Sequence, residues 1–420
     1  MTGSTNDESN SFILALVDEI PMGSLKDTLL DAETFTSHPD RFVSAECFED
    51  PFLQRLITAN LVSRVCTYSG RRARKPIAAP LDLVVTHILS SLECHYDDAA
   101  NGVAWEGGYV GDMTLDTYDL VDETVTFADD ASDTLRFDIV NALPQRDWSK
   151  IDPYGPRERD VLSWSWNDFT ETVKHVRRYF FERHLTSTDW REETVSPSQL
   201  LSEVLSNCEA TGMIRALPAG QRYFRCRSRK KGERYIHPID LGPPPAVKAS
   251  QSRMSPAGIP MFYGARERKT ARAEILEAGQ RYAIAEFRTT RPIRILDLTM
   301  SPRVSIFDPH NGHLNEWAHF MGAFVRDFQR PVAHDGAEHV DYVPTQVVSE
   351  YIRSWPRKGG QIDGVAYRSV KRPGGQCVVL FIDASEVEPA IDPREAPAGT
   401  KMLAMRVVTN RGKYAGERGA

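Results

Sequence analysis

The spacing of apolar residues changes character near residue 215, and this change most constrains the fold. Between residues 80 and 212 the apolar residues mainly recur three or four positions apart, as on one face of an α-helix. After residue 215, strand-like runs are interleaved with helical patterns. A chain of 420 residues is also longer than one hydrophobic core usually serves. We expect an α+β protein, with a mainly helical N-terminal domain followed by a compact α+β domain with a mixed sheet.

Three patterns place helices in the first part. Apolar residues at helical spacing, from Leu81 to Leu92, predict a helix that His95-Tyr-Asp-Asp98 closes. A second helix is predicted to begin at Asn167 or Asp168. Its apolar face is formed by Phe169, Val173, Val176 and Phe180. Ser196-Pro-Ser-Gln199 predicts a capping box that starts a third helix, which ends near Gly212.

The second part predicts both strands and helices. The expected strands are Tyr282–Arg288, Ile293–Leu298, Gly364–Tyr367 and Cys377–Ile382. The expected helices are Thr270–Ala278, Asn315–Gln329 and Thr345–Trp355, and the tail after Val408 is expected to be loose.

Charge and cysteine usage narrow the class of protein. A formal net charge of -7 disfavours a dedicated nucleic-acid binder. The six scattered cysteines contain no Cys-x-x-Cys pair, which argues against a disulfide framework and against a four-thiolate zinc site. Residues 112–133 hold eight carboxylates without Lys or Arg, and we interpret them as a solvated, mobile acidic loop. No apolar run approaches the ~20 residues of a membrane span, and Phe12–Val17 is too short for a signal-peptide core, so we expect a cytoplasmic protein.

The stretch from Arg253 to Glu274 carries the strongest chemical signal. It places Arg253, Tyr263 and Glu274 around a turn that Pro256, Gly258 and Pro260 make rigid. An Arg offers a planar fork to a phosphate, a Tyr offers an aromatic face to a ring, and a carboxylate stabilises a developing positive charge. Such a group suits a ligand with a phosphate, a ring and a hydroxyl.

This stretch, with Tyr223-Phe-Arg-Cys-Arg227 before it and Asp363-Gly-Val-Ala-Tyr-Arg-Ser369 after it, resembles the RES domain of bacterial toxins over roughly residues 216 to 390. Members of that family consume NAD or ADP-ribosylate a protein, and their site is similar to that of ADP-ribosyltransferases. The resemblance implies catalytic roles for Glu274, Tyr263, Arg253 and Ser369, and substrate-binding roles for Arg225, Arg227, Tyr342 and Gln346. It implies cleavage of NAD at the ribosyl-nicotinamide bond, with water, phosphate or a protein side chain as acceptor.

The segment from Arg64 to His95 resembles the HEPN-type domain that precedes some RES domains. Relatives carry Cys-x-x-Cys in its loop, whereas this chain has Cys66 followed by Ser69, which puts a metal role in doubt. The expected division is residues 1–63 as a partly disordered extension, 64–215 as the HEPN-like helical domain and 216–420 as the RES domain. The alternative function is a HEPN-type ribonuclease using Arg178 and His184, with the RES domain as ligand sensor. A non-catalytic binding module is the third hypothesis.

The expected ligands follow from the same resemblance. No Gly-x-Gly-x-x-Gly follows a strand, so NAD is expected as a substrate and no cofactor is expected. His310, His313 and His319 lack a His-x-x-x-His helical pair, so no metal site is expected. The expected partners are an antitoxin or regulatory protein and a second copy bound through the helical domain, with no membrane.

Overall fold

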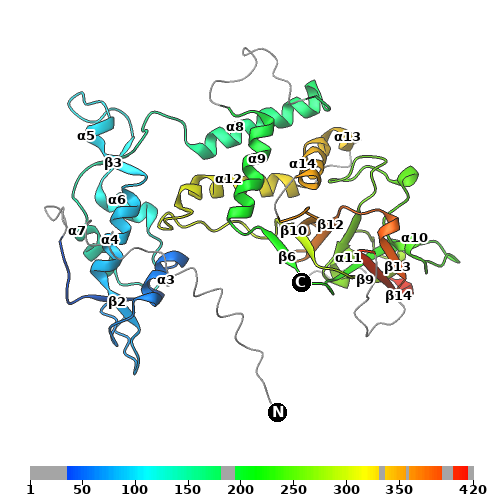
Figure 1. The fold of residues 1–420 in the computed structure, drawn as a ribbon, viewed down its shortest axis with the longest axis horizontal. Coiled ribbons are helices and arrows are strands. Elements are labelled where there is room, and N and C mark those ends of the chain that lie inside the picture. Colours follow the sequence, from blue (N-terminus) through cyan, green and yellow to red (C-terminus); the bar gives the residue numbers. More distant parts are fainter. Residues whose placement is uncertain (1–35, 181–193, 331–335, 356–358, 390–400, 415–420) are drawn as a thin grey trace. The chain divides into compact units, whose positions relative to one another are not determined.

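The computed structural model describes residues 36–180, 194–330, 336–355, 359–389 and 401–414 (Figure 1). These residues form two compact units. One contains the chain up to Tyr154 together with Phe307–Pro309, and the other contains the rest. Each helix among the described residues is too short or too polar to span a bilayer. The expected N-terminal extension lies outside the described residues as far as residue 35.

The first unit combines helices with two small sheets. Its helical elements are η1 (Ala45–Cys47), α3 (Pro51–Ala59), α4 (Leu81–Leu92), α5 (Ala99–Gly102), α6 (Thr117–Thr124) and α7 (Asp133–Ala142). Its strands pair as β1 (Phe42–Ser44) with β2 (Ala78–Pro80), and in the order β3 (Tyr96–Asp98), β5 (Trp148–Lys150) and β4 (Thr114–Leu115). The predicted helix is confirmed from Leu81 to Leu92, with Leu81, Val84, Val85, Ile88 and Leu92 buried. Its predicted end was wrong, because Tyr96–Asp98 form β3 and pair with β5.

The acidic stretch 112–133 is more ordered than predicted. Helix α6 lies inside it, begins after Asp116, and buries Leu120 and Val121. The Asp116 side chain accepts a hydrogen bond from the backbone N–H of Asp119 and so caps the helix. The interpretation as a mobile loop was wrong because several of these acids serve as caps and first-turn residues, where carboxylates stabilise helices.

The second unit holds the remaining helices: α8 (Glu158–Glu171), η2 (Thr172–Val176), α9 (Pro197–Ala210), α10 (Pro238–Leu241), η3 (Ala246–Lys248), α11 (Arg268–Ala273), η4 (Gly312–Leu314), α12 (Asn315–Gln329), α13 (Glu338–Asp341), α14 (Val343–Ser354) and η5 (Ala384–Glu386). The capping box is confirmed, with Ser196 and Gln199 bonding reciprocally at the start of α9. Gly212 follows α9 with a φ of 70°, the left-handed conformation that glycine adopts readily after a helix.

The start of α8 differs from the prediction. The helix begins at Glu158, because Leu162 and Trp166 extend the buried stripe of Phe169 toward the N-terminus. The stripe also ends earlier: Val173 is buried, but Val176 is 69% exposed and Phe180 is 74% exposed. The α-helix passes into one π-helical turn at η2, which shifts the residues that follow off the buried face.

A nine-stranded mixed sheet organises the second unit, in the order β13-β14-β9-β7-β8-β12-β11-β10-β6. Its strands are β6 (Ile214–Leu217), β7 (Arg222–Ser228), β8 (Phe262–Ala265), β9 (Arg281–Thr289), β10 (Ile293–Asp297), β11 (Gly364–Arg368), β12 (Gln376–Leu380), β13 (Val387–Pro389) and β14 (Leu403–Lys413). The pairs β10–β11 and β13–β14 are parallel and the others are antiparallel. All four predicted strands and the predicted helices Asn315–Gln329 and Thr345–Trp355 are confirmed to within a few residues. The predicted helix Thr270–Ala278 is only partly confirmed, because α11 already ends at Ala273. The expectation of a loose tail after Val408 was wrong, because β14 continues its pairing with β9 as far as Lys413.

Helices α8, α9, α12 and α14 gather against one face of this sheet (Figure 1). Their common core includes Trp166, Leu201, Trp317 and Ile352 and reaches the sheet at Val365 and Val379. The sheet is not continuous in its middle. Strand β7 pairs along its whole length with β9, but it pairs with β8 only at Phe224 and Ala265. Beyond that one pair the two central strands separate.

Candidate active site

A cleft of about 910 Å³ opens where β7 and β8 separate. It is lined by β7 from Phe224 to Ser228, by β8 from Tyr263 to Ala265, and by the segment 248–261 between them. Helix α11 and the turn after β11 complete the wall. Its volume lies in the range of small-molecule and cofactor sites.

The charges that line this cleft are strongly unequal. The described lining residues include five cations, namely Arg225, Arg227, Lys248, Arg253 and Lys371, and one carboxylate, that of Glu274. Cationic side chains that converge on a concave surface attract anionic ligands, and Arg in particular matches the geometry of phosphate. The cleft therefore suits a phosphorylated ligand that brings one region of positive or developing positive charge to Glu274.

Arg225 is the most exceptional of these cations. Its Nη1 atom is buried and has no hydrogen-bond partner among the described residues. Burial and the neighbouring charge of Arg227 lower the pKa of Arg225, while Tyr263 acts in the opposite direction. Arg227 points the same way from β7, and its Nη2 donates to the carbonyl oxygen of Gly242 at 3.0 Å. An anion bound beside Arg225 would satisfy a donor that the protein leaves unpaired.

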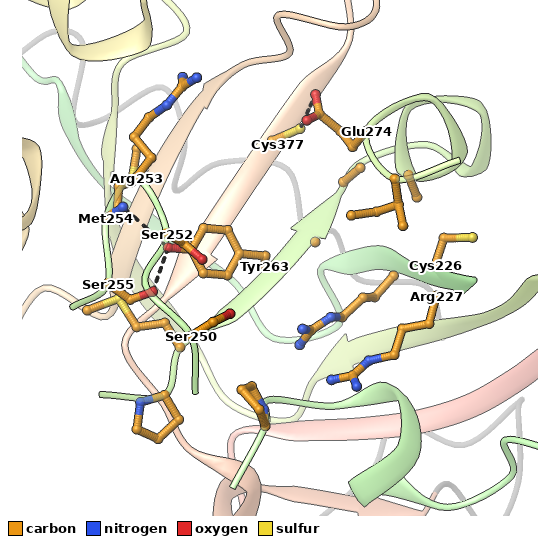
Figure 2. Close-up of a pocket in the computed structure, with 18 of the residues that line it drawn as sticks. Cys226, Arg227, Ser250, Ser252, Arg253, Met254, Ser255, Tyr263, Glu274 and Cys377 are labelled. Carbon is orange, nitrogen blue, oxygen red and sulfur yellow. Dashed lines mark hydrogen bonds between the residues drawn. The ribbon is translucent and has the colours of Figure 1, made fainter. Parts of the chain in front are cut away.

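Glu274 follows α11 as its C-cap residue, and one of its oxygens is held by two donors. Ser369 Oγ donates to Glu274 Oε1 at 2.5 Å, and Cys377 Sγ donates to the same atom at 3.7 Å. Figure 2 shows Cys377 and Glu274 meeting on one side of the cleft. The second oxygen, Oε2, accepts no hydrogen bond from a described residue, so it is the oxygen available to a ligand.

The turn after β11 brings Ser369 to Glu274. The backbone N–H of Ser369 donates to Gly375 O at 2.8 Å, and that of Arg372 donates to Ser369 Oγ at 3.0 Å. Arg372 also donates through Nη1 to Thr270 Oγ1 at 3.0 Å, which ties the turn to α11. Gly375 lies so close to Thr270 that a Cβ atom would come within 2.8 Å of it. The turn thus requires a glycine to pack against the helix that carries Glu274.

Tyr263 and Arg253 line the cleft together with the turn around Ser255 (Figure 2). The Tyr263 hydroxyl accepts from Met254 N at 3.3 Å and lies 3.0 Å from Ser255 Oγ. Burial raises the pKa of Tyr263, although these hydrogen bonds and Arg225 act against it, so the phenol stays neutral. Arg253 donates through Nη1 to Gln329 O at 2.7 Å, which fixes its guanidinium at the C-terminal end of α12.

The two residues expected at the start of α14 have different positions. Tyr342 lines the cleft, whereas Gln346 does not. The buried Gln346 amide donates to Ser252 O at 2.9 Å and to Ser255 O at 3.3 Å. Gln346 therefore supports the turn that carries Arg253 and Ser255, one layer behind the cleft.

Sequence reasoning missed several lining residues, among them Tyr235, Lys248, Tyr367, Lys371 and Cys377. Cys377 reaches Glu274 only because β12 lies between β8 and β11, with Cys377 opposite both Ala265 and Tyr367. That register is a tertiary property with no local signal. Lys248 belonged to a Pro-rich segment without periodicity. Tyr367 belongs to the Asp-Gly-Val-Ala-Tyr motif that precedes Ser369, and this position in the motif was the one sequence signal that could have indicated a lining residue.

The remaining candidate sites lie elsewhere. Arg178 follows η2, and its expected partner His184 lies outside the described residues. Within the described ranges, no group of three or more His, Cys, Asp or Glu side chains is arranged to hold a metal ion.

The fold and the cleft define an α+β protein whose C-terminal sheet opens around a basic, phosphate-suited site with one carboxylate. Comparison with protein families places it further: residues 59–187 match HEPN/RES N-terminal domain 1, and residues 222–398 match the RES domain. The chain is thus a RES domain protein, of a toxin family, with an HEPN/RES N-terminal domain 1 before the RES domain. Comparisons with curated proteins and with solved structures gave no match.

Proposed function

We propose that this protein is a toxin or defence effector that cleaves NAD at the bond between ribose and nicotinamide. The observation that carries the proposal is the setting of Glu274. It is the one carboxylate among the described lining residues, one of its oxygens is held by Ser369 and Cys377, and five cations share its cleft. NAD combines a pyrophosphate with a ribosyl bond whose cleavage develops positive charge, so it matches both features.

In the proposed reaction, the bond from the ribose C1′ to the nicotinamide nitrogen breaks, and nicotinamide leaves with the electron pair. An acceptor oxygen then bonds to C1′ and loses its proton. Glu274 would stabilise the positive charge on the ribose through Oε2. Arg225 and Arg227 would bind the pyrophosphate, and Tyr263 would contact the nicotinamide ring.

Arg253 and Ser369 have supporting positions in this scheme. Arg253 would hold phosphate on its remaining N–H groups, because Nη1 is occupied by Gln329 O. Ser369 would orient Glu274 through its 2.5 Å hydrogen bond. Gln346, as a part of the wall behind the cleft, would keep the 252–255 turn in place.

The test is nicotinamide release by the full-length protein incubated with NAD, with and without inorganic phosphate. Glu274→Gln keeps the size of the side chain and removes its charge, so release is expected to fall by about 100-fold or more. Glu277→Gln is the matched control, because Glu277 is exposed nearby in sequence and does not line the cleft. Release that needs phosphate would identify phosphorolysis, and release without it hydrolysis or transfer. Equal rates for wild type and Glu274→Gln would refute the proposal.

The ribonuclease alternative makes the opposite prediction. Under it, Arg178→Ala and His184→Ala would abolish RNA cleavage while Glu274→Gln would leave cleavage unchanged. A RES domain also suggests an antitoxin partner, and we infer that such a partner would restrain NAD loss in the cytoplasm. Nicotinamide release measured with and without a co-purified partner would test that inference.

A further inference from the structure

The fold of the first unit brings together two cysteines that are 19 residues apart in sequence. Cys47 ends η1, directly after β1, and Cys66 opens the turn 66–69. Their sulfur atoms lie 3.8 Å apart and both side chains are buried. Two hydrogen bonds hold the segments in this arrangement: Thr67 N donates to Phe42 O at 2.8 Å, and Phe42 N donates to the side-chain oxygen Thr67 Oγ1 at 3.0 Å.

The polar groups around the pair distinguish its two sulfurs. The Ser69 N–H donates to Cys66 Sγ at 3.5 Å, and Ser44 Oγ lies 3.5 Å from Cys47 Sγ. The hydrogen bond from Cys47 lowers the pKa of Cys66, burial acts against it, and the contacts of Ser44 and Ser69 lower it further. The same pairing, together with burial, raises the pKa of Cys47. Cys208 provides the contrast, because it is buried without such partners and its pKa is raised by burial alone.

We propose that Cys47 and Cys66 form a redox pair, in which a peroxide oxidises Cys66 and Cys47 then closes an intramolecular disulfide. The sulfur of Cys66 attacks one peroxide oxygen, the O–O bond breaks, and a sulfenic acid forms. The Cys47 sulfur then attacks the Cys66 sulfur, the S–O bond breaks, and water leaves. With hydrogen peroxide, two thiols and one peroxide give one disulfide and two waters.

The geometry favours this chemistry over zinc binding. A disulfide requires the sulfurs to approach to about 2.05 Å, a side-chain movement between atoms that already touch. A closed zinc site requires four ligands, and at the spacing of Ser44-x-x-Cys47 and Cys66-x-x-Ser69 the other two positions carry hydroxyls. The residue whose N–H contacts Cys66 Sγ, Ser69, is itself exposed, so the pair lies one residue away from the protein surface.

The test uses the full chain with Cys94→Ser, because Cys94 is exposed and would react for unrelated reasons. After brief treatment with hydrogen peroxide, intact mass is expected to fall by two hydrogen atoms, and peptide mapping without reductant is expected to link Cys47 to Cys66. In Cys47→Ser, a 1,3-diketone reagent is expected to trap a sulfenic acid on Cys66. In Cys66→Ser, Cys47 is expected to stay unlabelled.

Cys208 serves as the internal control, and Cys66 is expected to react at least about tenfold faster. An unchanged mass would overturn the proposal, as would a sulfenic acid on Cys47 or equal reaction of Cys66 and Cys208. The intact mass and the Cys47–Cys66 linkage are measured on the Cys94→Ser protein, which keeps both cysteines. The proposal is therefore tested even if a Cys47 or Cys66 variant fails to fold. None of these readouts depends on cleavage of NAD.

Discussion

Replacing Ser369 by Ala is expected to weaken NAD cleavage without removing the catalytic carboxylate. The substitution deletes the donor that lies 2.5 Å from Glu274 Oε1 and leaves the weaker sulfur donor of Cys377 at 3.7 Å. Hydrogen bonds to charged groups contribute about 1.5–3 kcal/mol. Since each 1.36 kcal/mol is tenfold in rate, kcat/KM for NAD is expected to fall about 10- to 100-fold.

The assay is steady-state nicotinamide release, with thermal unfolding measured in parallel. Ser369 Oγ also accepts from Arg372 N, so Ser369→Ala is expected to cost about 1 kcal/mol of stability and to remain folded. Ser385→Ala, an exposed serine away from the cleft, is the control and is expected to leave kcat/KM unchanged. The reasoning would be refuted if Ser369→Ala kept kcat/KM within about threefold of wild type while Glu274→Gln was inactive.

Two further substitutions test the electrostatics. Arg225→Met removes a cation whose Nη1 is buried and unpaired, so the melting temperature is expected to rise by about 2–4 °C, while calorimetry is expected to show at least about tenfold weaker NAD binding. The control Arg234→Met lies on an exposed loop and is expected to change neither the melting temperature nor NAD binding. A lower melting temperature of Arg225→Met with unchanged NAD binding would contradict the argument. Burial and the charges of Glu203 and Glu316 raise the pKa of Glu158 to about 7. The folded state then binds more protons than the unfolded state between about pH 4.5 and 7, so stability falls as pH rises through that window. Glu158→Gln is expected to raise the melting temperature at pH 8 and not at pH 4.5, and solvent screening keeps the rise modest. Equal shifts of the melting temperature at both pH values would exclude the ionisation of Glu158 as their cause.

Local sequence signals predicted the secondary structure well where the whole signal lay within a single helix or turn. The capping box at Ser196 and the apolar stripe of α4 are each complete within one turn or one helix, so no tertiary information was needed. Predictions were wrong where a local pattern had two interpretations. The same carboxylates that suggested a mobile loop cap α6, and the stripe through Phe169 extended toward Leu162 instead of toward Phe180.

The candidate site was only partly accessible to the same reasoning. Motifs supplied Arg253, Tyr263 and Glu274, because these residues lie close together in sequence. The contact of Cys377 with Glu274 depends on the strand order around β12, and the approach of Cys47 to Cys66 depends on how the 66–69 turn lies against β1. Such contacts arise from the register of distant segments, which no short pattern encodes.

The cleft is also the place where this fold departs from what stability alone would favour. A continuous pairing of β7 with β8 would satisfy the backbone groups along both strand edges, yet the pairing stops after Phe224 and Ala265. The same opening leaves the buried Nη1 of Arg225 unpaired beside further cations. The unpaired Nη1 costs free energy in the unliganded protein, and an anion bound beside Arg225 would relieve that cost. Because such departures concentrate at functional sites, the separation of β7 and β8 supports a phosphorylated substrate independently of any family resemblance.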